Sequence, residues 1–182
     1  MQSYSQNIIF LDTEFTTLDP AKGELMSIGL VRLDDGKELY LELEYNPATA
    51  EPWVKKHVVP NLTGKKVTRA AACKKIEQFI GKPATKKDKK PYLMAYVNQF
   101  DAIYWYKLFG SAKEHPAYWI PLDFASVLFA HGYSPNSLGK HRFFKELGLN
   151  KDDGDTHNAL DDARRLREIY VRFLERVKSA TS

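Results

Sequence analysis

NIIFLDTE, residues 7–14, sets four apolar residues directly before two acids. The apolar run is β-branched and then aromatic, which is typical of a strand buried on both faces. Asp12 and Glu14 stand two positions apart at its end, so their side chains leave the same face of the chain. Such a pair can share a cation, although two solvated loop acids would read the same. The stretch therefore predicts a buried strand that ends in a carboxylate pair.

The residues that follow predict a sheet with helices. Strands are expected over residues 24–33 and 38–45, joined by a hairpin turn at the Asp-Gly step of DDGK. The second of them alternates leucines with acids and a tyrosine, which predicts an outer strand with one wet face. A short helix is expected within residues 53–62 and a firmer one over 68–80. Further on, strands at 92–97 and 119–123 alternate with helices at 98–109, 124–129 and 137–147, and a long helix begins near residue 158. We thus expect an α/β fold, a mixed β-sheet flanked by helices, in one domain over residues 1–182.

Composition limits the classes of protein. The chain has 182 residues, 43% of them hydrophobic and 13% aromatic, which favours a packed core and excludes a disordered or fibrous chain. The net charge of +4 permits an anionic partner without requiring one. Cys73 is the single cysteine, which excludes an intramolecular disulfide and favours a reducing, cytoplasmic location. No apolar run reaches the roughly 18 residues of a membrane helix, and the amino terminus lacks secretory features, so no membrane partner is expected.

A third acid lies in YVNQFDAIYW, residues 96–105. Asp101 falls in the first turn of a helix that follows a buried strand, a place that projects beyond the edge of the sheet. An acid there also complements the helix dipole, with Asn98 as an N-cap three residues earlier. Function and helix stability are both open for Asp101.

The last acidic group lies in DTHNALDDARR, residues 155–165. With Asn158 as N-cap, Asp161 is explained by capping or by an ion pair with Arg165. Asp162 faces inward beside the apolar stripe of the helix, where an unpaired carboxylate is costly, so it is favoured as a ligand. His157 precedes the helix and is either catalytic or a surface histidine that flanks it.

Together, FLDTEF, YVNQFDAIYW and HNALDDA resemble the three motifs of the DEDDh exonucleases, a family of ribonuclease H-like fold that includes oligoribonuclease, ribonuclease T and polymerase proofreading subunits. The five-residue step from His157 to Asp162 matches the histidine branch of that family. Within it, the blocks DTEF, SIG, WVKKHVVPNL and YVNQFD most resemble the adenylate-preferring exoribonucleases of the RNase AS type.

The resemblance implies a role for each matching residue. Asp12, Glu14, Asp101 and Asp162 would hold two Mg²⁺ or Mn²⁺ ions, with Asp12 shared between them and Asp101 acting directly or through water. His157 would be the general base, since an imidazole titrates near neutrality. Substrate contacts are expected at Phe15, Asn98 and Thr13, although Phe15 could instead pack in the core and Asn98 only cap its helix.

The expected function is a metal-dependent 3′-to-5′ exoribonuclease that releases nucleoside 5′-monophosphates from single-stranded RNA ends. An exonuclease of single-stranded DNA, in repair or defence, is the alternative enzyme, because the contacts that recognise a 2′-hydroxyl cannot be placed from sequence. A nucleic-acid-binding module without catalysis is a third reading, against which the complete acidic set argues. The resemblance also implies a homodimer.

Overall fold

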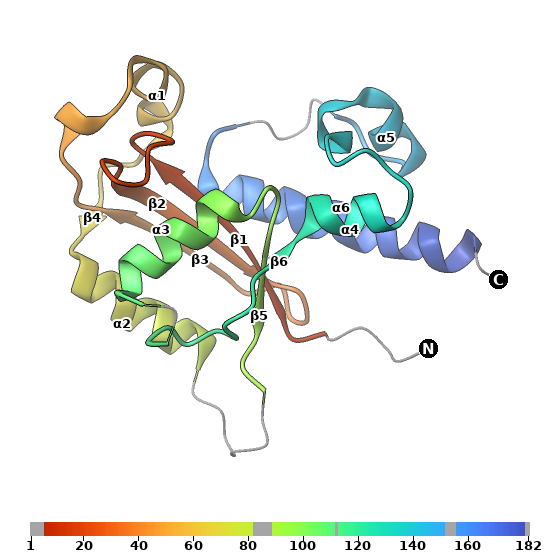
Figure 1. Cartoon of the computed structure of the whole chain (residues 1–182), viewed down its shortest axis with the longest axis horizontal. Coiled ribbons are helices and arrows are strands. Elements are labelled where there is room, and N and C mark those ends of the chain that lie inside the picture. Colours follow the sequence, from red (N-terminus) through yellow and green to blue (C-terminus); the bar gives the residue numbers. More distant parts are fainter. Residues whose placement is uncertain (1–5, 82–88, 112, 152–155, 181–182) are drawn as a thin grey trace.

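The central feature is a six-stranded mixed sheet (Figure 1). The computed structural model describes residues 6–81, 89–111, 113–151 and 156–180. The strands are ordered β4-β3-β2-β1-β5-β6. Their bounds are β1 Ile8–Phe15, β2 Leu25–Arg32, β3 Glu38–Leu43, β4 Lys66–Val67, β5 Tyr92–Ala95 and β6 Leu122–Asp123. The β1–β2 and β2–β3 pairs are antiparallel, whereas β1–β5, β5–β6 and β3–β4 are parallel.

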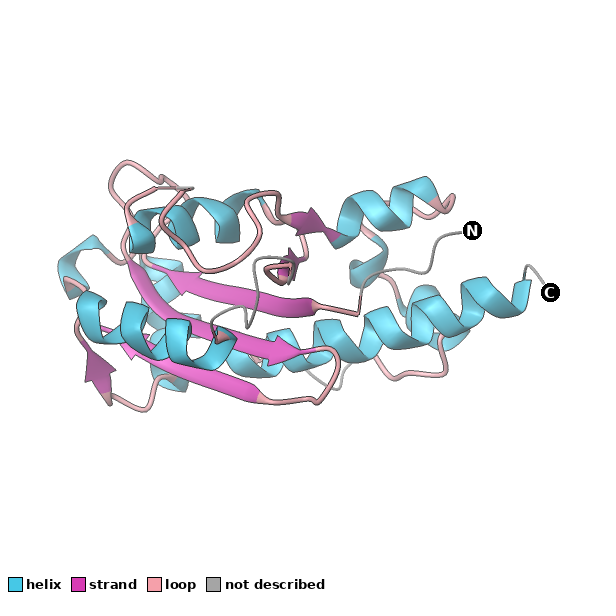
Figure 2. Ribbon diagram, turned by 90° about the horizontal axis from the view of Figure 1, so that it is seen from below, coloured by secondary structure: helices cyan, strands magenta, loops and turns pink. Residues whose placement is uncertain are grey.

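Helices cover both faces of this sheet, as Figure 2 shows. α2 (Arg69–Ile80) and α3 (Gln99–Phe109) pack on one face, and the long α6 (Ala159–Ala180) packs on the other with α4 (Phe124–Ala130) and α5 (His141–Glu146). α1 (Pro52–His57) lies beyond one end of the sheet (Figure 1). Three short 3₁₀ turns complete the described elements: η1 Pro47–Thr49, η2 Val59–Asn61 and η3 Ser137–Gly139. The predicted mixed sheet flanked by helices is confirmed.

β1 supplies side chains to both layers because successive residues of a strand point to opposite faces. Ile9 and Leu11 pack toward α2 and α3, while Ile8 and Phe10 pack toward α6. The Phe10 ring meets Tyr170 of α6 at a centroid distance of 5.3 Å. A strand that is apolar on both faces, as the run before Asp12 predicts, is therefore explained by two helical layers.

Gly29 lets α6 approach the sheet closely. This glycine of β2 lies opposite Asp12 of β1 in the antiparallel register. A Cβ added at Gly29 would lie 2.1 Å from the carbonyl oxygen of Ala159, the first residue of α6. Any larger residue would push the helix away, because real Cβ atoms do not approach backbone so closely. The first turn of α6 is thus held directly over the end of β1.

Two expectations about the elements are wrong. β3 is not an outer strand, because β4 pairs with its last two residues, and its second face is wet only in part, since Glu38 and Glu44 are exposed but Glu42 is buried. Glu42 on that face is 2% exposed and accepts the Gly64 backbone N–H at 2.7 Å, and Glu38 pairs with Arg164 of α6 at 2.6 Å. The helix expected over residues 137–147 is divided, since Lys140 is extended (φ −120°, ψ 122°) between η3 and α5. Among the described residues, none of the helices has the length and apolar character needed to span a bilayer.

Candidate active site

Three carboxylates meet where β1 ends beneath the first turn of α6. Asp12, Glu14 and Asp162 each offer an oxygen, and these oxygens all lie within 4.8 Å of one another. Asp12 and Glu14 share the face of Phe10 by the alternation of the strand, and that face is covered by α6. Asp162 comes down onto them from the first turn of α6. The expectation that Asp162 faces inward is met, and the three together could hold a metal ion.

Asp101 approaches the same strand end from the other layer. It lies in the first turn of α3, is 6% exposed and accepts a hydrogen bond from the Thr13 hydroxyl at 2.8 Å. Thr13 lies between the two acids of β1 and therefore points to the opposite face, toward α3. The structure thus places Asp101 beside the cluster but outside the group of three whose oxygens lie within 4.8 Å. That Asp101 binds a metal ion, directly or through water, stays a prediction.

A cavity of about 620 Å³ opens over the cluster. Asp12, Glu14, Asp162 and His157 line it together. His157 lies just before α6, which Asn158 caps by accepting the backbone N–H groups of Leu160 and Asp161 at 3.1 and 3.3 Å. Positive charge on the wall comes from Lys151 and from Arg165, which covers the buried Phe144 ring at 5.1 Å, and aromatic surface comes from Tyr96. The cavity therefore combines an acidic floor, an imidazole and basic groups, a set suited to a phosphodiester and a cation.

The electrostatics of the cluster favour a bound cation. Burial, followed by the charges of Asp162 and Asp101, raises the pKa of Glu14 from 4.5 to about 8. Burial likewise raises the pKa of Asp12, and the neighbouring charges of Asp101, Asp162 and Glu14 raise it further. For Asp101, burial raises the pKa and the hydrogen bond from Thr13 partly opposes this. Carboxylates that cannot all be ionised without compensation are the hard oxygen donors that Mg²⁺ and Mn²⁺ bind, so this donor set fits a divalent metal.

Comparison with protein families gives a decisive match. A family model described as Exonuclease matches residues 9–170, which contain the whole cluster, Asp101 and His157. The chain belongs to the exonuclease family. A search of curated protein sequences finds no significant match.

Solved structures share the fold of this exonuclease domain. The nuclease domain of 3′hExo, a DEDDh family member bound to rAMP, superposes with a TM-score of 0.63 at 16% identity, over 92% of this chain and 91% of that one. A 3′-exonuclease that recognises the 3′ end of histone mRNA stem-loop gives 0.65 at 17%, over 92% and 63%. E. coli exonuclease I, with zinc and single-stranded DNA, gives 0.60 at 17%, over 90% and 39%. This chain thus spans less than two thirds of the last two proteins. The predicted ribonuclease H-like fold and the membership of an exonuclease family are confirmed, while the DEDDh branch and the closer likeness to the RNase AS type stay predictions.

The three expected substrate residues of the exonuclease domain lie around the cluster rather than over it. Phe15 is half-buried and stacks on Tyr104 at 4.4 Å between ring centroids. Thr13 lines the cavity, but its hydroxyl is engaged by Asp101. Asn98 is 3% exposed, and its amide donates to the Leu122 carbonyl at 2.6 Å. Their contact with substrate stays a prediction.

Two local expectations are corrected. The Asn98 side chain makes no capping hydrogen bond to α3, because its own backbone is helical (φ −60°, ψ −7°) and not extended as in an N-cap; its side-chain amide donates to the Leu122 carbonyl of the neighbouring β6. Asp161 pairs with Arg164 at 2.6 Å and not with Arg165, whose Nη1 binds Glu168 at 2.6 Å.

Sequence reasoning did not find Trp53 as a neighbour of the site. Its ring lies edge-on to His157, 5.0 Å between centroids. The available signal was one aromatic residue next to two lysines in a short helix, which by itself favours no site. The contact depends on α1 lying beside a segment that is more than 100 residues further along the chain.

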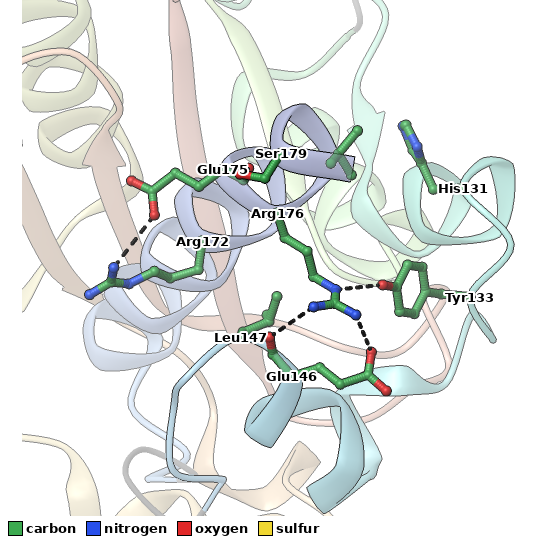
Figure 3. A pocket seen from close by; sticks show the side chains of 9 residues that line it. His131, Tyr133, Glu146, Leu147, Arg172, Glu175, Arg176 and Ser179 are labelled. Carbon is green, nitrogen blue, oxygen red and sulfur yellow. Dashed lines mark hydrogen bonds and ion pairs between the residues drawn. The ribbon is translucent and has the colours of Figure 1, made fainter. Parts of the chain in front are cut away.

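A second cavity, of about 710 Å³, lies near the carboxyl end of α6 (Figure 3). Its charged side chains satisfy one another: Arg176 contacts the Tyr133 hydroxyl at 3.0 Å and Glu146 at 3.3 Å, and Arg172 pairs with Glu175 at 3.4 Å. It contains none of the predicted site residues of the exonuclease domain. The smaller cavity is therefore the candidate active site.

The raised pKa values predict that metal and pH act together on stability. The pKa of Glu14 in the folded chain, about 8, exceeds its ordinary value of 4.5. The contribution of protonated Glu14 to the stability of the fold is therefore fully present below pH 4.5 and is lost as the pH rises toward 8. Between pH 4.5 and pH 8, we expect the Tm of the EDTA-treated protein to fall by on the order of 5 °C more than the Tm of the Glu14→Gln variant falls. Mg²⁺ should raise Tm more at pH 8 than at pH 5, which differential scanning fluorimetry would measure. Equal Mg²⁺ effects at both values would contradict a cation held by ionised carboxylates.

Proposed function

We propose that this protein is a metal-dependent 3′-to-5′ exoribonuclease that releases nucleoside 5′-monophosphates from single-stranded RNA. The observation that carries the proposal is the Asp12, Glu14 and Asp162 cluster, open to a cavity that His157 also lines, within an exonuclease domain. Carboxylates whose oxygens lie within 4.8 Å of one another repel each other when they are ionised, as the raised pKa values of Asp12 and Glu14 indicate. Their arrangement is accounted for by a cation and its substrate.

Asp12, Glu14 and Asp162 would hold the metal, with Asp101 beside them, and we take Mg²⁺ or Mn²⁺ as two ions per site from the family resemblance. Bound divalent cations would offset the negative charge that develops on the phosphodiester and its leaving oxygen. His157 is the group in the cavity suited to take the proton of the attacking water. Thr13 fixes the orientation of the Asp101 carboxylate by its 2.8 Å hydrogen bond.

The remaining residues of the cavity suit a single-stranded polyanion. Lys151 and Arg165 place positive charge on its wall, where a phosphate backbone would pass. Tyr96 adds aromatic surface of the kind that bases contact. We propose RNA and not DNA from the resemblance of the sequence blocks to exoribonucleases of the RNase AS type, while the similar solved structures include both a nuclease domain bound to rAMP and an exonuclease bound to single-stranded DNA.

Several expectations remain predictions from the sequence. They are the homodimer, the cytoplasmic location, the single domain over residues 1–182 and the use of Mg²⁺ or Mn²⁺ in the cell.

The proposal is tested with 5′-labelled single-stranded RNA and DNA of one sequence, each incubated with Mg²⁺, Mn²⁺ or EDTA. We expect a metal-dependent ladder from the 3′ end of RNA, slower cleavage of DNA, and nucleoside 5′-monophosphate identified by mass spectrometry. Asp162→Asn serves as the inactive control. Degradation of DNA alone would establish the alternative exonuclease. Binding without cleavage of either would establish a nucleic-acid-binding module.

A further inference from the structure

His157 is held in a backbone conformation that needs support. Its φ is +49°, in the left-handed region that residues other than glycine seldom adopt. Such a conformation is unfavourable for a residue with a Cβ and persists where the surroundings impose it. The structure outside α6 must therefore contribute to the placement of this histidine.

The support comes from residues 53–61, which follow β3. On the backbone side, the Asn61 amide donates to the carbonyl oxygens of Thr156 at 2.6 Å and His157 at 3.4 Å. On the side-chain side, the Trp53 ring meets the His157 imidazole at 5.0 Å and 81°, an edge-to-face arrangement. His57 stacks on Trp53 at 4.9 Å and 26°. The imidazole thus lies against an indole that is itself backed by a second ring.

This segment is fixed to the sheet and does not move freely. Val54 and Val58 are 7% and 1% exposed in a cluster with Met26 of β2. The backbone N–H of Glu51, which precedes α1, donates to the Thr16 carbonyl at 2.9 Å, one residue beyond β1. The support for His157 is therefore anchored to the same strand end that carries the acidic cluster.

Trp53 is not explained by core packing. Its exposed fraction is 54%, whereas Trp105 is fully buried. A large apolar side chain kept at the surface of a six-residue helix has no stabilising role comparable with that of Val54 beside it. Its ring contacts are instead with His57 and His157.

We propose that Trp53, backed by His57, is a positioning residue that holds the His157 imidazole toward the acidic cavity. The inference rests on the proposed function, in which His157 takes a proton from water. Trp53 acts through His157 and does not touch the reacting atoms. When a general base is displaced by about 1 Å, the rate of the catalysed reaction can fall greatly. The orientation of the His157 imidazole is therefore expected to affect kcat directly.

The kinetic test uses single-stranded RNA with saturating Mg²⁺. Trp53→Ala is expected to lower kcat about tenfold while KM changes less than about twofold, because the ring orders the base and not the substrate. Trp53→Phe should restore most of kcat, since a phenyl ring preserves the edge-to-face contact. Trp119→Ala is the matched control, because the exposed fraction of Trp119 is 62% and this residue does not line the cavity. This variant should have the kcat and KM of the unmodified protein.

A double mutant separates positioning from other effects. In a His157→Gln background, Trp53→Ala should cause no further loss, because residues that act through one another are not additive. A rise in KM at unchanged kcat would overturn the inference and make Trp53 a base-stacking residue. Full additivity with His157→Gln would overturn it as well.

A readout without catalysis distinguishes failure of this inference from failure of the proposed function. In metal-free protein, NMR resolves the imidazole resonances of the five histidines, and His157→Gln assigns that of His157. Trp53→Ala should move this resonance, through loss of the indole ring current, and leave that of His141 unchanged. An unmoved His157 resonance in a variant with unaltered circular dichroism would overturn the inference, whatever the nuclease assay shows.

Discussion

Asp12→Asn is expected to lower kcat/KM for RNA by about a thousandfold or more and, at the same time, to raise the Tm of the metal-free protein. Asp12 is the carboxylate whose pKa is raised by burial and by three neighbours, Asp101, Asp162 and Glu14. The amide keeps the shape of the side chain but removes its charge, so the repulsion within the cluster falls. Losing a metal ligand removes several kcal/mol of transition-state stabilisation, and each 1.36 kcal/mol is tenfold in rate.

Opposite signs for activity and stability are the diagnostic feature of this result. Asp161→Asn is the matched control, since Asp161 has a side chain 43% exposed and pairs with Arg164 on the surface of α6. Asp161→Asn should leave kcat/KM and the Tm of the metal-free protein near the values of the unmodified protein, because exposed ion pairs contribute little to stability. A drop in metal-free Tm for Asp12→Asn would mean that the carboxylate stabilises the fold and is not held there for a cation.

His157→Gln is the second change with a large effect, expected to lower kcat by roughly a hundredfold to ten-thousandfold. Loss of a general base removes proton transfer but leaves the three carboxylates in place. The increase of Tm caused by Mg²⁺ should therefore persist in this variant, in contrast to Asp12→Asn. Kinetics on single-stranded RNA, together with scanning fluorimetry, measure both quantities.

His141→Gln provides the comparison, because His141 is an exposed histidine at the start of α5 outside the cavity. It should retain the rate of the unmodified protein. Full activity of His157→Gln would assign proton removal to another group, and loss of the Mg²⁺ effect would assign His157 to metal binding.

The parts of the fold that depend on local pattern could be predicted from the sequence. The apolar run before Asp12 is a central strand, the DDGK turn joins β2 to β3, and the helix expected over residues 68–80 is α2. The inward orientation of Asp162 followed from the apolar stripe of its helix. These features are set by residues within one or two turns of each other.

What could not be predicted depends on segments far apart in the chain. Glu42 lies on the expected wet face of β3, yet Thr63 and Gly64 fold over it and supply its hydrogen-bond donors. Asn98 has the chemistry of an N-cap, but its backbone is already helical, and its side-chain amide donates to the Leu122 carbonyl of a strand 24 residues away. The place of Trp53 beside His157 likewise requires the whole path of the chain from α1 to α6.

The contact of Gly29 with the first turn of α6 has a consequence for biosynthesis. Because a ribosome delivers the chain from its amino terminus at about 5 to 20 residues per second, β1 emerges with Asp12 long before α6. All six strands precede residue 124, whereas Asp162 and the helix that lies on Gly29 come after it. A nascent chain can thus pair its sheet while the metal site is still incomplete. The acidic cluster of the proposed nuclease would therefore become complete only when α6 docks on a sheet that has already formed.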